Sequence, residues 1–217
     1  RWNETNVAFS RPVRWLVALL GSQVVPFRFA GVASGRTTRG LRPLGSPAIE
    51  LARAGEYTEA MARQQILLDV DERRDIVRGQ AQALAASVGG RIPEDPALLD
   101  EVTNLVERPT ALLGRFDPDY LALPREVLTA SLRDHQSALT VEREGALLPL
   151  FLTVMDRPDD PVGRVRAGNE WVVAARLADA EFFARKDAET PLAERAERLR
   201  SLAFHERLGS YAAKSER

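Results

Sequence analysis

Residues 147–155 read Leu-Leu-Pro-Leu-Phe-Leu-Thr-Val-Met and predict the best-buried strand of the chain. A short, continuous apolar run of this kind is typical of a strand that is covered on both faces. Upstream of it, Thr110–Phe116 predicts another strand and Pro124–His135 predicts a helix. The middle of the chain is therefore expected to contain a sheet with helices packed against it.

The first 40 residues predict a hairpin followed by a loop. Arg14–Leu20 is apolar at successive positions, which suits a strand covered on both sides, and Val24–Ala30 follows after a break at Gly21-Ser22. In the second strand Val25, Phe27 and Phe29 share one face, which is expected to pack. Gly31–Gly40 is rich in glycine and arginine and predicts a basic loop, in which Ser34 is expected to be a turn residue.

Helical spacing replaces strand spacing over residues 46–108. Val77, Ala81, Leu84 and Val88 recur at intervals of four, three and four residues, and Gly89-Gly90 ends that helix. Asp95-Pro96 is a typical helix start, because aspartate caps free backbone amides and proline suits the first turn. We therefore expect a helical insertion at about residues 46–108, after which the sheet resumes.

The last third of the chain predicts a long helix and then a connector. Asp159-Asp160-Pro161 is expected to cap a helix that continues to about Lys186, with a buried seam. Asn169 and Arg176 lie two turns apart and close to that seam, and Arg176 with Asp179 can form an ion pair that holds the helix in place. Pro191–Leu208 alternates acids and bases and predicts a solvated helix. The residues of the expected seam are Val173, Leu177, Ala180 and Ala184.

These elements predict an α+β protein with a mostly antiparallel sheet, a helical insertion and a long C-terminal helix. The expected organisation is one domain over residues 1–190 and a helical connector over 191–217, which leads towards a further downstream domain. The sequence starts without methionine, and we expect it to be an internal segment of a longer protein.

Composition excludes several classes of protein. The 217 residues contain no cysteine and two histidines, which excludes disulfides, thiolate metal sites and a histidine cage. The longest apolar run, Trp15–Leu20, is far shorter than the roughly 20 residues that span a membrane. We therefore expect a cytoplasmic protein with no membrane partner.

No catalytic or metal-binding residue can be assigned from the sequence. Gly31–Arg36 lacks the spacing and the lysine of a phosphate-binding loop. The pairs Asp69/Asp71 and Asp117/Asp119 could hold magnesium, but each stands at an expected helix start, where capping is the better interpretation. His135 could act as a general base, but no nucleophile lies beside it, and capping its own helix is the alternative.

The strongest functional signal is positive charge near the start of the chain. The whole chain has a net charge of −1, yet residues 1–45 contain seven arginines, Arg1 among them, against the single acid Glu4. Arg36, Arg39 and Arg42 recur every three residues beside glycines, an arrangement that can grip phosphates. The alternative is an ordinary loop whose arginines pair with the acidic residues of the insertion.

Several ordered blocks resemble the beta subunit of the bacterial two-subunit glycyl-tRNA synthetase. The resemblance covers nearly the whole chain, with the blocks in the same order and at similar spacing. It is carried by residues 9–21 (Phe-Ser-Arg-Pro-Val-Arg-Trp-Leu-Val-Ala-Leu-Leu-Gly), 34–40 (Ser-Gly-Arg-Thr-Thr-Arg-Gly), 99–107 (Leu-Asp-Glu-Val-Thr-Asn-Leu-Val-Glu), 168–170 (Gly-Asn-Glu), 175–183 (Ala-Arg-Leu-Ala-Asp-Ala-Glu-Phe-Phe) and 204–209 (Phe-His-Glu-Arg-Leu-Gly).

The resemblance implies a part of a glycine-tRNA ligase in which ATP, magnesium and glycine bind at the alpha subunit. It implies no cofactor in this segment, and glycine tRNA, the alpha subunit and downstream domains as partners. Where the family has His-Arg-Phe and Lys-Tyr-Phe-Pro, this chain has Leu41-Arg42-Pro43 and Ser137-Ala-Leu-Thr140. Those departures remove groups that could contact RNA. The tRNA-binding residues that we predict are Arg36, Arg39, Arg42, Arg133 and Gln136.

Three functional hypotheses follow. The first is a tRNA-handling and scaffold segment that is not catalytic by itself but supports ATP-dependent glycylation of tRNA. The second is a protein-interaction module that packs on the alpha subunit or on downstream domains without touching RNA. The third is a hydrolytic editing domain, which the lack of an assignable nucleophile or metal set disfavours.

Overall fold

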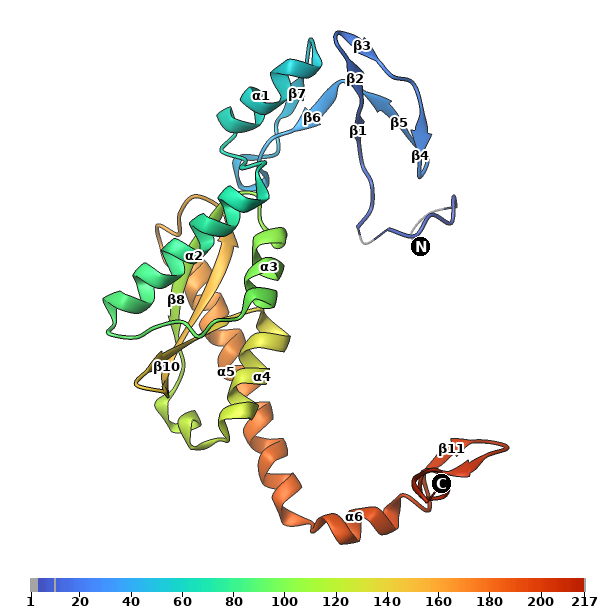
Figure 1. Cartoon of the computed structure of the whole chain (residues 1–217), viewed down its shortest axis with the longest axis vertical. Helices are drawn as coiled ribbons and strands as arrows, with labels where there is room; N and C mark the ends of the chain where they lie inside the picture. The colour runs from blue at the N-terminus through green and yellow to red at the C-terminus, as the bar shows by residue number, and fades with distance from the viewer. Residues whose placement is uncertain (1–3, 10, 217) are drawn as a thin grey trace.

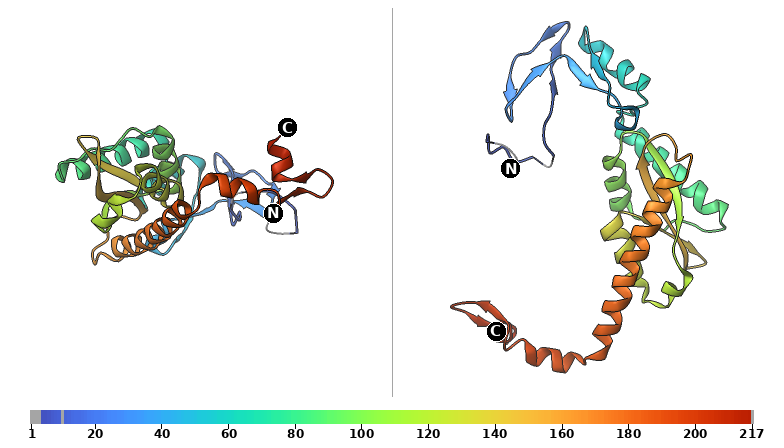
Figure 2. Two further views of the ribbon diagram at one scale, coloured as in Figure 1. Left: turned by 90° about the horizontal axis from the view of Figure 1, so that it is seen from below. Right: turned by 180° about the vertical axis from the view of Figure 1, so that it is seen from behind.

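The computed structural model describes residues 4–9 and 11–216. The molecule is elongated and curved (Figures 1 and 2): a small β-rich unit lies at one end, a helix–sheet–helix unit in the middle and a C-terminal arm at the other end. Helices and mostly antiparallel sheets are both present, and α5 (Arg164–Glu189) is the long helix, so the predicted α+β class is confirmed.

The N-terminal unit consists of short strands and one helix. Strand β5 pairs with β4 in antiparallel and with β1 in parallel, while β2 pairs with β3 and β6 with β7. Helix α1 packs over a core that is centred on Leu41, Leu51 and Met61. The elements are β1 (Leu16–Val17), β2 (Leu19–Leu20), β3 (Gln23–Val24), β4 (Arg28–Phe29), β5 (Val32–Gly35), β6 (Thr37–Arg39), η1 (Arg42–Leu44), β7 (Ala48–Glu50), η2 (Ala54–Glu56) and α1 (Tyr57–Arg63).

The predicted basic loop at Gly31–Gly40 is wrong, because this segment is two strands, β5 and β6. Its β-branched residues Val32, Thr37 and Thr38 favour extended backbone more strongly than its glycines oppose it. Ser34 is not a turn residue either. Its hydroxyl donates to the Val25 carbonyl at 2.7 Å and accepts from the Phe27 amide at 3.0 Å.

The predicted hairpin exists around Gly21-Ser22, but its strands are only two residues long and poorly covered. Leu20 is 74% exposed, and Val25, Phe27 and Phe29, which were expected to pack, are all exposed. Pro26 lacks a backbone donor and interrupts the second strand between β3 and β4.

The central unit has three layers. The antiparallel sheet has the order β8-β10-β9, with β8 at Pro109–Arg115, β9 at Leu139–Arg143 and β10 at Ala146–Asp156. Helices α2 (Val70–Ser87) and α3 (Pro96–Leu105) cover one face, and α4 (Arg125–Gln136) and α5 cover the other. The short helix η3 (Pro118–Ala122) connects β8 to α4. The predicted strands at Thr110 and Leu147 and the predicted helix at Pro124 are confirmed.

Strand β10 supplies both cores, as its continuous apolar sequence predicts. Leu152 and Val154 belong to the core under α2 and α3, whereas Phe151 belongs to the core under α4 and α5. On the outer edge of the sheet, the Gln80 side chain of α2 accepts from the Ala111 amide at 2.7 Å and donates to the Pro109 carbonyl at 3.5 Å. This side chain satisfies backbone groups of an edge strand.

The sheet does not resume after the helices, contrary to the prediction. In the described part of the chain, the strands before residue 51 and those from residue 109 onward share no sheet. Helix α1 belongs to the N-terminal core, while α2 and α3 pack on the second sheet. Hydrophobic spacing identified these helices, but it contains no information about which sheet each one covers.

Aspartates cap several helices. Asp69 accepts from the amides of Asp71 and Glu72, and Asp117 accepts from the Asp119 amide, as the capping interpretation requires. Asp160 accepts from the amides of Val165 and Arg166, although α5 itself begins later than predicted, at Arg164. These backbone hydrogen bonds lower the pKa of Asp160.

The C-terminal arm contains less helix than predicted. Helix α6 (Leu192–Arg198) is followed by a hairpin of β11 (Ala203–His205) and β12 (Gly209–Ser210) and by α7 (Tyr211–Ser215). The predicted helix therefore ends at Arg198, ten residues early, and Gly209, with φ of +88°, a conformation that glycine adopts readily, begins β12. A domain boundary near residue 190 stays a prediction.

Candidate nucleic-acid interface

Six described arginines before residue 46 give the N-terminal unit its positive charge, while Arg53 and Arg63 of the same unit pair with Glu56 and Glu59. Arg1 lies outside the described residues. The six are Arg11, Arg14, Arg28, Arg36, Arg39 and Arg42. Within residues 4–9 and 11–216, none of the six lies within 4.0 Å of a carboxylate. Elsewhere many guanidinium groups are neutralised by ion pairs, as at Arg74, Arg78 and Arg125. The N-terminal unit therefore keeps its positive field.

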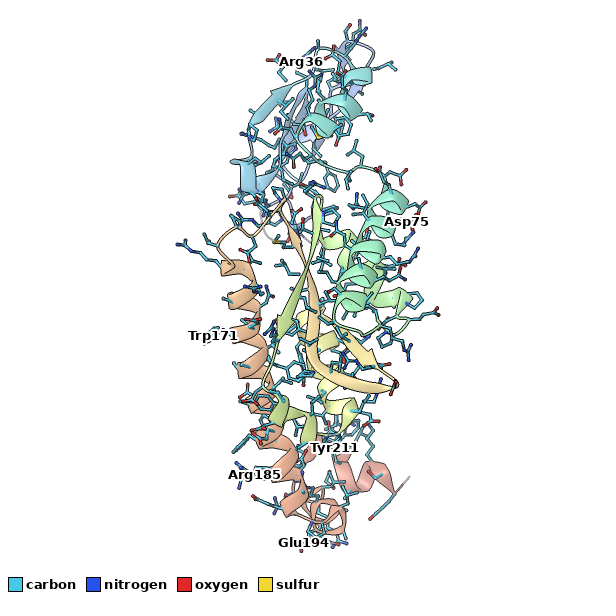
Figure 3. The ribbon with its side chains drawn as sticks, turned by 90° about the vertical axis from the view of Figure 1, so that its left-hand side faces the viewer. Arg36, Asp75, Trp171, Arg185, Glu194 and Tyr211 are labelled. Carbon is cyan, nitrogen blue, oxygen red and sulfur yellow. The ribbon has the colours of Figure 1, made fainter. Side chains whose placement is uncertain are left out.

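Arg36 uses its donors inside the fold. Its Nη1 donates to the carbonyls of Leu51 and Ala52, each at 3.2 Å, and its Nη2 donates to the Ser22 carbonyl at 3.0 Å. The guanidinium thus links the β2–β3 turn to the segment after β7. Figure 3 labels Arg36 at the N-terminal end of the molecule. Its charge remains uncompensated, but the side chain holds the unit together.

Arg39 and Arg42 do not belong to the same element as Arg36. Arg36 stands at a bend between β5 and β6, Arg39 is the last residue of β6 and Arg42 is the first residue of η1. Arg39 is exposed and makes one long hydrogen bond of 3.4 Å to the Ser46 carbonyl. Arg42 is exposed in η1 and acts electrostatically on Glu107, across the junction with the central unit.

Glu107 marks that junction. The residue is exposed overall, yet partial burial of its carboxyl, followed by repulsion from Asp156, raises its pKa, while Arg42 and Arg73 oppose the shift. The Asp156 carboxylate accepts from the backbone amides of Glu107 and Arg108, both at 2.8 Å. The Leu67 amide donates to the Glu107 carbonyl at 3.0 Å. These bonds fix the chain that joins the two units.

Arg133 and Gln136 lie on α4 in the central unit, on an element distant from β6 (Figure 1). The Arg133 Nε lies 2.6 Å from an Asp95 carboxylate oxygen, and its Nη1 lies 2.9 Å from Asp134. These hydrogen bonds raise the pKa of Arg133 and lower that of Asp95. Arg133 therefore joins α4 to the start of α3. Gln136 lines a shallow pocket with His135 and Ser137.

The three residues predicted to hold α5 behave differently. Asn169 is half-buried and donates to the Val165 carbonyl at 2.8 Å within its own helix. Arg176 and Asp179 are both exposed, and no ion pair joins them in the part of the chain that the structure describes. Helix α5 is held instead by Val173 and Leu177, which pack under α4 and the sheet.

Two features escaped the sequence analysis. Arg11 and Arg14 are exposed and have no ion pair among the described residues, so they extend the positive region. Glu142, on β9, is 3% exposed and lies between Arg91 and Arg125. The arginine excess over residues 1–45 includes Arg11 and Arg14 but did not single them out, whereas no local signal in the sequence indicates the second feature.

Over residues 4–9 and 11–216, no group of three or more histidine, aspartate or glutamate side chains is arranged to hold a metal ion. In the same residues no helix combines the length and apolar character that a membrane crossing requires.

Comparison with known proteins places the chain in a family. A family model described as glycyl-tRNA synthetase beta subunit matches residues 1–217. Proteins named glycine–tRNA ligase beta subunit from Desulfitobacterium hafniense (strain Y51) and Moorella thermoacetica are 46% and 43% identical to it over 218 residues. The match covers 100% of this chain and 31% of each relative, so the chain spans about a third of their length. Because the family model matches the chain throughout, the chain belongs to the glycyl-tRNA synthetase beta subunit family.

Proposed function

We propose that this chain is the tRNA-handling and scaffold segment of a glycine-tRNA ligase beta subunit. In this role it supports the synthesis of glycyl-tRNA, while ATP and magnesium act at the alpha subunit and the segment itself performs no chemistry. Membership of the beta subunit family supports the coarse role. The observation that carries the finer role is the set of six N-terminal arginines, none of them ion-paired among the described residues.

The proposed tRNA contact is to the phosphate backbone. Unpaired, exposed guanidinium groups attract phosphates at any sequence, and such contacts position a nucleic acid without reading its bases. The predicted residues differ in whether their guanidinium groups are free to contact a phosphate. Arg39 and Arg42, with Arg11 and Arg14, are exposed, whereas Arg36 and Arg133 are occupied within the fold.

The test is tRNA binding by the full-length subunit after Arg14, Arg39 and Arg42 are changed to alanine, with Arg36 kept to preserve the fold. We expect the affinity to fall roughly tenfold to a hundredfold, because three charge-assisted contacts are lost. The slope of log affinity against log salt should shrink by about 0.7–0.9 for each lost phosphate contact. Filter binding of glycine tRNA over a salt series measures both quantities.

A matched control removes the same charge elsewhere. Arg78, Lys186 and Arg200 lie outside the N-terminal unit and are exposed but pair with Asp75, Glu189 and Glu197, so their alanine variants should leave the salt slope close to that of the unchanged protein. If the N-terminal and control variants bind tRNA equally well and with equal slopes, the N-terminal unit does not hold tRNA.

A second candidate role is a protein-interaction module that packs on the alpha subunit or on the rest of the beta subunit without RNA contact. Large apolar side chains that are left in solvent favour it, notably Leu192 at 85% exposure and Trp171 at 75%. Parallel capture of the alpha subunit and of tRNA by the chain separates the two roles. Capture of the protein without capture of tRNA would favour the second.

A further inference from the structure

Helix α5 carries two apolar seams on opposite faces. The inner seam contains Val173 and Leu177, which are fully buried. The outer seam is displaced from it by two residues, which is about 200° around a helix of 3.6 residues per turn. Its members follow one another at intervals of three, four, three and four residues: Gly168, Trp171, Ala175, Ala178 and Phe182.

The outer seam is open to solvent along its whole length. All five of its residues are exposed, with Trp171 at 75% and Phe182 at 47%. Figure 3 shows Trp171 on the side of α5 that faces away from the sheet. A helix that only covers a sheet needs one apolar stripe, with polar residues on its opposite face. The composition of the outer face is therefore not explained by packing within these 217 residues.

The spacing of the outer seam indicates the shape of its partner. Alternating intervals of three and four residues are the pattern by which one helix packs along another at a shallow crossing angle. Ala175 and Ala178 allow a close approach at the centre, and Trp171 and Phe182 flank them about three turns apart. A helix with its own apolar stripe matches this surface.

Two observations indicate that this helix comes from another part of the beta subunit. Curated relatives are aligned over only 31% of their length, so most of the relatives' length lies outside the matched region. Among the described residues, none after Leu177 is buried, and the arm over residues 190–216 has no core of its own. A short hairpin with small helices does not usually remain ordered without further protein against it.

We infer that the outer seam of α5 is the docking site for a helix from the part of the full-length beta subunit outside these 217 residues. The inference rests on the second proposed role, packing, and specifies its surface and its occupant. Docking there places α5 between two cores, with the sheet on one side and the rest of the subunit on the other.

Thiol labelling tests this directly, because the 217 residues contain no cysteine. Ala178→Cys places a small thiol at the centre of the outer seam. Val162→Cys is the matched control, since Val162 is 72% exposed, lies two residues before α5 begins and is not part of the seam. Each variant is made both in the 217-residue chain and in the full-length subunit, and mass spectrometry follows maleimide labelling at the introduced position.

We expect Cys at position 178 to react roughly 100-fold more slowly in the full-length subunit than in the 217-residue chain, because a docked helix must open locally before the reagent enters. The control should react at similar rates in both proteins.

Equal rates at position 178 overturn the inference. So does protection that appears only when the alpha subunit is added, or protection in the 217-residue chain that grows with its concentration, which would identify a second copy as the occupant. None of these outcomes changes the salt dependence of tRNA binding, so a failure here is distinguishable from a failure of the tRNA-handling role.

Discussion

Changing Arg91 and Arg125 together to alanine should destabilise the central unit by about 3–5 kcal/mol, because it leaves the buried Glu142 carboxylate without a positive partner. Glu142 is 3% exposed, its Oε2 lies 3.0 Å from Arg91 Nη2, and its Oε1 contacts the Arg125 guanidinium. Removing an ion from water costs several kcal/mol, and only paired charges or hydrogen bonds offset that cost. Equilibrium urea unfolding followed by circular dichroism measures the loss.

The loss of stability should extend beyond the ion pairs themselves, because Glu142 lies where two segments of the chain are joined. Arg91 and Glu142 also exchange backbone hydrogen bonds, of 2.7 and 2.9 Å, which attach the segment after α2 to the edge strand β9. Adding Glu142→Leu to the double variant removes the stranded charge and should restore at least half of the lost stability. The exposed arginines Arg63 and Arg78 serve as a control, for which losses below about 1 kcal/mol are expected. A loss that small in the Arg91/Arg125 variant would mean that Glu142 does not depend on its arginines.

The second large effect is expected at Gly114, which is paired with Phe151 across β8 and β10. A Cβ at position 114 would lie 2.3 Å from the Cζ of Phe151 and within 2.8 Å of both Cε atoms. The ring occupies the space where the side chain would be, and Phe151 is 1% exposed in the core under α4 and α5. Gly114→Ala should therefore cost about 1–3 kcal/mol through overpacking.

Two further variants separate overpacking from any general effect of alanine. Adding Phe151→Leu to Gly114→Ala frees space and should recover part of the stability that Gly114→Ala loses. Gly79 lies within α2, and a Cβ there would meet nothing within 4 Å, so Gly79→Ala should stabilise by about 0.5–1 kcal/mol. Urea midpoints compare all variants on one scale. A neutral Gly114→Ala would show that the Phe151 ring can move aside.

The central unit could be predicted from the sequence because its signals are local and agree with one another. The apolar run at residues 147–155 is long enough to identify β10, and its consecutive apolar positions correspond to the two cores that it serves. Asp69, Asp95 and Asp117 cap helices where their sequence contexts indicated. Each of these features depends on residues within a few positions of one another.

The N-terminal unit and the arm were predicted less well because their structure depends on distant contacts. Gly-rich composition suggested a loop at residues 31–40, whereas pairing of β5 with β1 and β4 makes part of it a strand. Charge alternation suggested a helix through residue 208, whereas α6 ends at Arg198 and the pairing of β11 with β12 makes residues 203–210 a hairpin. Spacing within a sequence does not specify which segments will pair.

The candidate site illustrates the same limit at the level of single side chains. A spacing of three residues suggested that Arg36, Arg39 and Arg42 grip phosphates together, but the bend at Arg36 and the start of η1 at Arg42 place the three arginines in different elements. Arg36 donates to three carbonyl groups, which lie 14, 15 and 16 residues away in the sequence. Net charge over residues 1–45 predicted the sign of the surface, but not which guanidinium groups remain available.

Arginine footprinting of the full-length subunit tests most directly the claim that the N-terminal unit holds tRNA. The subunit is modified with phenylglyoxal in the presence and absence of glycine tRNA, and mass spectrometry quantifies the modification at each arginine. We expect tRNA to protect Arg11, Arg14 and Arg39 and to leave the ion-paired Arg78 and Arg200, which lie outside the N-terminal unit, unchanged. Equal modification of all five arginines with and without bound tRNA would contradict it.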